Sequence, residues 1–231
     1  MPAVIEFNFD PAIRLGDIVV RWETLALALV IVVCVGLAAV IAGRTPAVNE
    51  AYPEMGGRER GAWHLRRDDL IYILLGVVPA AVLGGRLGYI LIHWDFYSEH
   101  PGSWFDPTQG SLELSLAVVF GMVAGYAVAA GLGAPAGRWL HIAIVPTLLG
   151  LTLGKFVGVL GANGRGAATS IEWATAYQGA GPWSSLDAAT PAHPSQVYEA
   201  LLSLLVLGLI VYLLRIGRFR DHDGRVFFAG I

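Results

Sequence analysis

Five long apolar stretches constrain the fold of this 231-residue chain more than any other feature. A helix needs about 20 apolar residues in succession to cross the hydrocarbon core of a membrane, which is roughly 30 Å thick. Four stretches qualify clearly and a fifth, slightly shorter one still fits; they cover residues 24–42, 70–93, 112–132, 139–161 and 195–214. Only 14% of the residues are charged, against about 25% in an average soluble chain. The sequence therefore predicts an all-α, polytopic integral membrane protein, a helical bundle with five complete spans.

The segments outside these stretches suggest no second domain, so we expect a single membrane domain over residues 1–231. Residues 1–23 carry acidic side chains and no basic start, unlike a signal peptide, and we expect them to form a lead-in on the outer surface. Residues 162–194 form a long outer loop that suits the membrane interface. A sixth apolar run begins at residue 226 and stops at Ile231, so we expect a fragment or a truncated homologue.

Positive charges alternate from loop to loop. The loop between the first two spans contains five arginines, whereas residues 94–111 contain no lysine or arginine. Arg138 lies in the short third loop, the long fourth loop has only Arg165, and the fifth loop contains four arginines. Because cytoplasmic loops carry the excess of basic residues, the pattern predicts an N-terminus outside and the first, third and fifth loops in the cytoplasm.

Four ionisable residues within the predicted spans should lie at similar depth. Arg86 and Lys155 are each 16 residues from the cytoplasmic start of their spans, which is about 24 Å along a helix. Glu113 and Glu199 lie within four residues of the outer end of spans that run inward. Charges inside a membrane cost about 3 kcal/mol each and usually mark a functional site. Ion pairs Arg86–Glu113 and Lys155–Glu199 that only hold helices together are the simpler alternative.

The string His-Pro-Ser-Gln-Val-Tyr-Glu at residues 193–199 places several polar groups at the start of the last complete span. Its simplest interpretation is a helix start, with Pro194 as the first helical residue and His193 or Ser195 as a cap. A small-molecule transporter is less favoured, because charges near the membrane midplane and discontinuous helices are absent from the sequence pattern.

Together with Gly-Gly-Arg-Leu-Gly-Tyr at residues 84–89, this string resembles the prolipoprotein diacylglyceryl transferases. The resemblance includes Trp22 after a basic residue and the order of the spans, and it covers the chain from about Val20. It implies transfer of a diacylglyceryl group from phosphatidylglycerol to the lipobox cysteine of lipoprotein precursors, at the outer side of a bacterial plasma (inner) membrane. It also implies a multi-pass protein in the lipid bilayer, with no cofactor, no metal and no nucleic acid as partner.

The resemblance implies a set of site residues. The expected catalytic residues are His193, Tyr198 and Glu199, and the expected phospholipid-binding residues are Arg86, Tyr89, Glu113, Lys155 and Gln196. In this scheme Arg86 and Lys155 hold the lipid phosphate, which suits cationic side chains. A thiol must lose its proton to become nucleophilic, so a base is expected, and it could be Glu199 or His193.

The chain departs from the family's pattern at several positions. The family signature Gly-Arg-x-Gly-Asn-x-x-Asn-Gly-Glu aligns without gaps with residues 154–163, and the replacements there include Lys155, Gly158, Gly161 and Asn163. The family's histidine is missing at residues 115–117, the tyrosine after Trp22 is Glu23, and a further arginine would lie beyond Ile231. These departures support a second hypothesis, a catalytically inactive relative that binds anionic phospholipid or a lipoprotein precursor.

Overall fold

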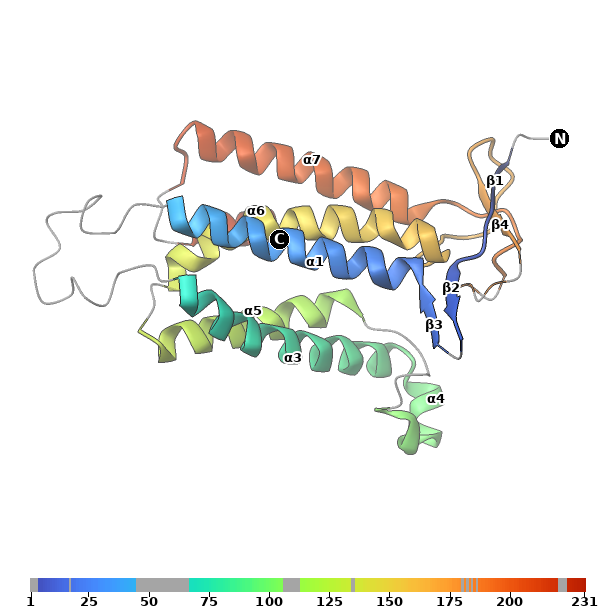
Figure 1. The fold of residues 1–231 in the computed structure, drawn as a ribbon, viewed down its shortest axis with the longest axis horizontal. Helices are drawn as coiled ribbons and strands as arrows, with labels where there is room; N and C mark the ends of the chain where they lie inside the picture. Colours follow the sequence, from blue (N-terminus) through green and yellow to red (C-terminus); the bar gives the residue numbers. More distant parts are fainter. Residues whose placement is uncertain are drawn as a thin grey trace, which may run out of the picture. The chain divides into compact units, whose positions relative to one another are not determined.

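The computed structural model of this protein describes residues 4–16, 18–44, 67–105, 113–133, 136–179, 181, 183, 185, 187–219 and 224–231. It is mostly helical, as Figure 1 shows. The chain divides into two compact units. The first unit comprises Met1–Ala38 and Leu140–Ile231, and the second comprises Ala39–Trp139.

Helices form at all five predicted stretches. Their bounds are Trp22–Arg44 (α1), Arg67–Ile92 (α3), Leu114–Gly131 (α5), Ala136–Val157 (α6) and Ser195–Arg215 (α7). Within the described residues, four of these helices are long and apolar enough to cross a membrane, and α5 is shorter. Its 18 residues would still reach about 27 Å. The mostly helical architecture with membrane-length helices is as predicted, whereas the number of spans and their orientation stay predictions.

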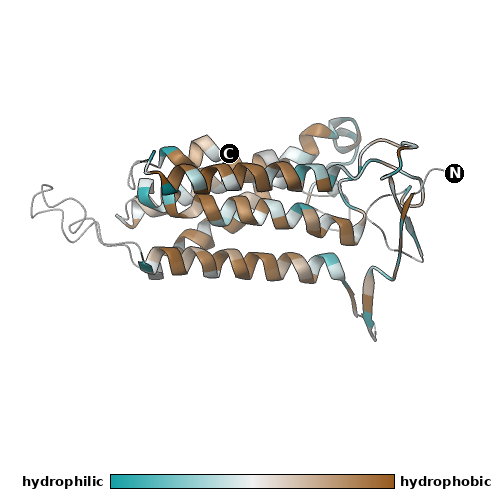
Figure 2. Ribbon diagram, turned by 90° about the horizontal axis from the view of Figure 1, so that it is seen from above, coloured by the Kyte–Doolittle hydropathy of each residue, from teal (hydrophilic) through white to brown (hydrophobic). Residues whose placement is uncertain are grey.

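Many large apolar side chains of these helices are exposed. The hydropathy colouring of the ribbon in Figure 2 shows that the long helices are mostly apolar. Leu202 and Leu205 of α7 are 64% and 67% exposed, and Val32 of α1 is 67% exposed. Soluble monomers rarely expose contiguous apolar surface on this scale. The helices therefore present the kind of surface that packs against lipid.

Shorter elements connect and flank the long helices. They are β1 (Ile5–Asn8), β2 (Ala12–Leu15), β3 (Ile18–Arg21), α4 (Trp94–Glu99), η1 (Pro101–Ser103), η2 (Gly158–Gly161), β4 (Thr175–Gln178) and α8 (Arg225–Gly230). Strands β2 and β3 form an antiparallel hairpin that leads directly into α1. The short helix α8 lies where a sixth span was predicted to begin. The all-α prediction did not include the four short strands, which lie outside the predicted spans.

Strand β1 of the lead-in pairs in parallel with β4 of the loop 162–194. Phe7 lies opposite Tyr177 in this register, and their rings stack with centroids 4.9 Å apart. A pair between strands so far apart in sequence depends on tertiary contacts rather than on local pattern. The lead-in is therefore structurally joined to the loop 162–194, a connection that the sequence did not reveal.

Glycines line the contact between α3 and α5 in the second unit. A Cβ atom built on Gly84 would overlap the carbonyl oxygen of Leu116 and lie 2.6 Å from Cβ of Phe120. A Cβ atom on Gly125 would lie 2.8 Å from Cγ2 of Val77. The small residues thus let the two helices approach closely, as glycines do in membrane helix pairs.

We expect Gly84→Ala to destabilise the second unit, because its methyl group has no space between Leu116 and Phe120. Overpacking of this kind costs about 1–3 kcal/mol. The midpoint of thermal unfolding in detergent should fall accordingly. The matched control is Gly36→Ala in α1, where an added Cβ would meet no described atom within 4 Å. Equal unfolding temperatures for the two variants would contradict the close packing of α3 and α5.

Candidate functional site

The end of α6 and the start of α7 are joined by an ion pair in the first unit. The Nζ atom of Lys155 contacts Oε2 of Glu199. Their side chains are 33% and 49% exposed, so the pair is only partly buried. Ion pairs with this exposure contribute about 0–1 kcal/mol. The predicted meeting of Lys155 and Glu199 is thus observed, and the pair can open at low cost.

The ion pair lies on two helix faces that pack against each other. Gln196 precedes Glu199 by three residues on α7, and Lys155 precedes Gly158 by three residues, so each couple lies on one face of its segment. A Cβ atom on Gly158 would lie 3.8 Å from Cβ of Gln196. The face of α7 that carries Gln196 and Glu199 therefore packs against the face that carries Gly158 and Lys155.

Gln196 is buried, with 1% of its surface exposed. Its Nε2 atom lies at hydrogen-bond distance, 3.5 Å, from the hydroxyl of Tyr177. Within the described part of the chain, its Oε1 atom is buried and makes no hydrogen bond. Since a buried polar atom is normally satisfied, this oxygen is available to a ligand that brings a donor.

Three side chains form an exposed polar cluster beside the start of α7. Nε1 of Trp173 donates a hydrogen bond of 2.7 Å to the hydroxyl of Tyr198, and that hydroxyl lies 3.4 Å from Nδ1 of His193. The indole N–H only donates, so the Tyr198 oxygen is the acceptor in the first bond. The structure thus joins His193 to Tyr198, both predicted site residues, and adds Trp173.

Backbone hydrogen bonds to the start of the loop 162–194 hold the backbone of His193 in place. Its N–H donates to the carbonyl of Ala167 at 3.0 Å, and its own carbonyl accepts from the N–H of Gly166 at 2.8 Å. A Cβ atom on Gly166 would collide with Oγ of Ser195. Pro194 occupies the N-cap of α7 and makes no side-chain cap hydrogen bond. The prediction that a helix starts here is thus correct, but Pro194 is its N-cap and Ser195 is the first helical residue.

Arg165 binds backbone carbonyls of the loop 162–194, and its sequence pattern did not predict this role. Its guanidinium donates to backbone carbonyls of the loop, those of Thr175, Asp187, Ala188 and Thr190. The guanidinium carbon also lies 5.3 Å from the ring centre of Tyr177. As the only cation between residues 162 and 194, Arg165 was visible in the sequence. Only the folded loop reveals that it binds carbonyl groups.

Burial changes the acid–base properties of this arginine and tyrosine. Burial lowers the pKa of Arg165, and the neighbouring Tyr177 partly opposes this effect. Burial raises the pKa of Tyr177, against the opposing effects of Arg165 and the hydrogen bond with Gln196. Tyr177 therefore stays a neutral hydroxyl that can accept the hydrogen bond from Gln196.

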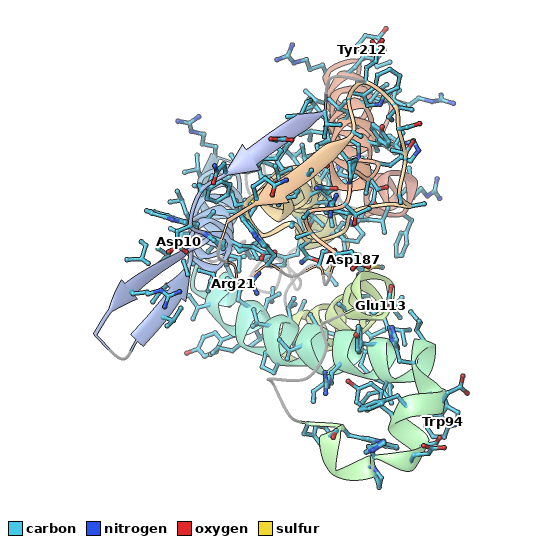
Figure 3. The ribbon with its side chains drawn as sticks, turned by 90° about the vertical axis from the view of Figure 1, so that its right-hand side faces the viewer. Asp10, Arg21, Trp94, Glu113, Asp187 and Tyr212 are labelled. Atoms are coloured by element: carbon cyan, nitrogen blue, oxygen red, sulfur yellow. The ribbon has the colours of Figure 1, made fainter. Side chains whose placement is uncertain are left out.

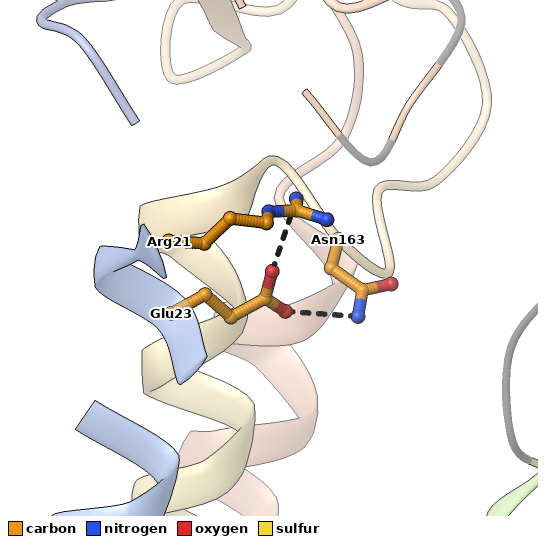
Figure 4. A network of polar contacts seen from close by, with 3 residues as sticks. All are labelled: Arg21, Glu23 and Asn163. Atoms are coloured by element: carbon orange, nitrogen blue, oxygen red, sulfur yellow. Dashed lines mark hydrogen bonds and ion pairs between the residues drawn. The ribbon is translucent and has the colours of Figure 1, made fainter. Parts of the chain in front are cut away.

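A buried carboxylate lies at the start of α1. Glu23 is 8% exposed, and its Oε2 atom lies 3.3 Å from Nη2 of Arg21. Its Oε1 atom accepts a hydrogen bond of 3.0 Å from Nδ2 of Asn163, as Figure 4 shows. Glu23 and Asn163 are two of the positions that depart from the family signature. In the sequence they are 140 residues apart and read as separate replacements, and only the structure shows that they touch.

The second unit contains Arg86 on α3. Its Nε atom donates to the carbonyl of Trp104 at 2.5 Å and its Nη2 atom donates to the carbonyl of Ser103 at 2.7 Å. The guanidinium carbon lies 5.3 Å from the ring centre of Tyr97. At least two of the five guanidinium N–H groups thus bind the chain segment after α4. The role of Arg86 toward phosphate stays a prediction.

Glu113 and Tyr89 also lie in the second unit. Glu113 precedes α5 beside α3 (Figure 3), and its N–H donates to the carbonyl of Gly85 at 2.8 Å. Its Oε2 atom accepts from the N–H of Leu116 at 2.9 Å. Tyr89 stacks on His93 with ring centroids 4.2 Å apart. Glu113 therefore lies next to the α3 turn that carries Arg86, as the depth argument predicted.

The structure thus arranges the predicted site residues in two groups. The first unit brings together His193, Gln196, Tyr198, Glu199 and Lys155, and the second unit contains Arg86, Tyr89 and Glu113. A single site built from both groups stays a prediction.

Comparison with known proteins identifies the family. The family described as prolipoprotein diacylglyceryl transferase matches residues 11–229. The phosphatidylglycerol–prolipoprotein diacylglyceryl transferase of Methylocella silvestris is 30% identical over 92% of this chain and 72% of its own length. The proteins of the same name from Nitrobacter hamburgensis and Geobacter sulfurreducens are 32% and 31% identical, over 89% and 97% of this chain and 66% and 77% of their own lengths. As its motifs had suggested, the chain belongs to the prolipoprotein diacylglyceryl transferase family and is a transferase.

Proposed function

We propose that this chain transfers a diacylglyceryl group from phosphatidylglycerol to the lipobox cysteine of lipoprotein precursors. The reaction takes place at the outer side of a bacterial plasma membrane. The protein is a single multi-pass membrane domain with five complete spans, the start of a sixth and its N-terminus outside. The names of its relatives support the substrates, and the alternation of basic loops supports the orientation.

The observation that carries the proposal is the arrangement of polar groups where α6 meets α7. A partly exposed cation and carboxylate, Lys155 and Glu199, lie on the same contacting faces as the buried amide of Gln196. A phospholipid head group offers a matching set: an anionic phosphate for the lysine and glycerol hydroxyls that can donate to Oε1 of Gln196. The exposed Trp173 and Tyr198 are typical of a membrane interface, where such a head group lies.

The chemistry follows from an exchange of partners at Lys155. A phosphate oxygen replaces the carboxylate of Glu199 on the Lys155 ammonium, at a cost of about 0–1 kcal/mol for the opened pair. The released carboxylate then accepts the proton of the lipobox thiol. The thiolate sulfur forms a bond to the carbon of the diacylglyceryl group that is attached to the phosphate through oxygen. The carbon–oxygen bond breaks, and glycerol phosphate leaves with its electron pair.

The remaining predicted residues assist this step. His193, linked to Tyr198 and Trp173, is the second group able to accept the thiol proton. Within the second unit, Arg86 binds phosphate, with Tyr89 and Glu113 as the neighbouring head-group contacts. A guanidinium suits phosphate because its planar geometry allows two parallel hydrogen bonds.

One observation favours the second candidate, an inactive relative that binds anionic phospholipid or a lipoprotein precursor. Both predicted phosphate-binding cations already have protein partners: Lys155 pairs with Glu199, and Arg86 binds the carbonyls of Ser103 and Trp104. In such a protein the lipid would bind without turnover, and Glu199→Gln would leave binding unchanged.

The direct test is transfer itself. Purified full-length protein, given phosphatidylglycerol vesicles and a lipobox peptide, should produce a peptide with a thioether-linked diacylglyceryl group, detectable by mass spectrometry. Phosphatidylcholine vesicles and a peptide with serine in place of the lipobox cysteine are the negative controls. Binding of phosphatidylglycerol without any product would refute the enzyme and support the inactive relative.

Variants of Lys155 distinguish a role in phosphate binding from a role in helix packing. Lys155→Arg should keep or raise activity, because a guanidinium makes two parallel hydrogen bonds to phosphate. Lys155→Met keeps much of the apolar stem, removes the charge, and should abolish transfer in a protein that still inserts and folds.

The double variant Lys155→Met, Glu199→Gln is the decisive comparison for this residue. It removes both members of the ion pair, so it relieves the unpaired carboxylate that the single variant leaves behind. We expect it to stay inactive in the same mass-spectrometric assay. Recovery of transfer would mean that Lys155 only pairs with Glu199.

The partner exchange predicts that Glu199→Gln lowers two kinetic constants, KM and kcat, for different reasons. The KM for phosphatidylglycerol should fall, because the phosphate no longer competes with a carboxylate for Lys155. The value of kcat should fall by about a hundredfold or more, the usual contribution of a general base. Steady-state kinetics with mixed vesicles would measure both. A higher KM with an unchanged kcat would contradict the exchange.

A further inference from the structure

We propose that Glu23 and Asn163 form a positioning pair, one carboxylate and one carboxamide, that fixes the turn between Lys155 and Gln196. Neither residue is among the catalytic or binding residues of the proposed function. The inference rests on that function for its kinetic effect, but the contact between the two side chains is a property of the fold.

The turn at residues 158–164 needs external support. After α6 ends at Val157, the chain continues as η2 and then passes through Ala162 at φ 58° and Gly164 at φ 72°. The left-handed conformation is unfavourable for a residue with a Cβ atom such as Ala162. Within the turn, the N–H of Asn163 donates to the carbonyl of Gly158 at 2.9 Å.

Glu23 supplies that support from a different element. Its carboxylate accepts the hydrogen bond from the Asn163 amide, and it lies against Gly161, where a Cβ atom would be 2.7 Å from Cδ of Glu23. Arg21 lies 3.3 Å from the same carboxylate. The start of α1 is therefore attached to both sides of Ala162, the strained residue of the turn.

The turn lies directly against a residue of the proposed site, Gln196. Cβ atoms on Gly158 and on Gly164, at the two ends of the turn, would each lie 3.8 Å from Cβ of Gln196. Lys155 is three residues before Gly158, at the end of α6. A shift of the turn would therefore displace Gln196 on one side and Lys155 on the other.

An isosteric exchange tests this pair. In Asn163→Asp two carboxylates face each other across a 3.0 Å contact, so the turn should loosen and kcat/KM for transfer should fall by about ten- to a hundredfold. Adding Glu23→Gln restores one carboxylate and one carboxamide, with the hydrogen bond reversed. This double variant should recover most of the wild-type kcat/KM.

The matched control is Glu172→Gln combined with Asn163→Asp, since Glu172 is an exposed carboxylate of the same loop. It makes the same chemical change away from the pair and should give no recovery. Full activity of Asn163→Asp, equal recovery with Glu172→Gln, or no recovery with Glu23→Gln would each overturn the inference.

A second measurement separates this inference from the proposed function. Hydrogen exchange of the Asn163 backbone N–H should accelerate by about tenfold or more in Asn163→Asp and return toward wild type in the double variant with Glu23→Gln. This readout requires no transferase activity. A wild-type protein without transfer would refute the proposed function, while unchanged exchange in Asn163→Asp would refute the positioning pair.

Discussion

The cost of placing a charge in apolar surroundings governs the arrangement of the polar residues in this protein. Several ionisable groups on or beside the apolar helices have a polar partner nearby. Lys155 binds Glu199 across two helices, Glu23 binds Arg21 and Asn163, and Arg86 binds backbone carbonyls after α4. Because these partners come from different elements, the polar contacts also determine how the ends of the helices are joined.

In the loop 162–194 of the first unit, the polar partners of the charged group are backbone carbonyls. Arg165 donates to several carbonyls of its own loop, and strand β4 of that loop pairs with β1 from the lead-in. The buried Tyr177 lies between these features: it stacks on Phe7, faces Arg165 and accepts a hydrogen bond from Gln196. The loop therefore packs against the start of α7, where its Tyr177 contacts the proposed head-group contact Gln196.

Partner exchange is the feature that connects this packing to the proposed chemistry. A fully buried ion pair would be costly to break, whereas Lys155 and Glu199 are exposed enough for a phosphate to compete. A lysine in place of the family's arginine fits such an exchange, because a point charge loses little specific geometry when it changes partners. The contacts of Glu23 with Arg21 and Asn163 would keep the surrounding turn in place meanwhile.

Sequence alone determined the membrane-length helices, because about 20 apolar residues in succession rarely form anything other than a long apolar helix. It also indicated the family through residues 84–89 and 193–199, and the meeting of Lys155 and Glu199, since helical rise converts residue number into position along a helix. It could not reveal that Glu23 touches Asn163, that β1 pairs with β4, or that Arg165 binds carbonyls. These contacts join residues distant in sequence or irregular loop backbone, and no local periodicity encodes them. Only the tertiary structure decides them, because they depend on which helix ends and loops are packed side by side.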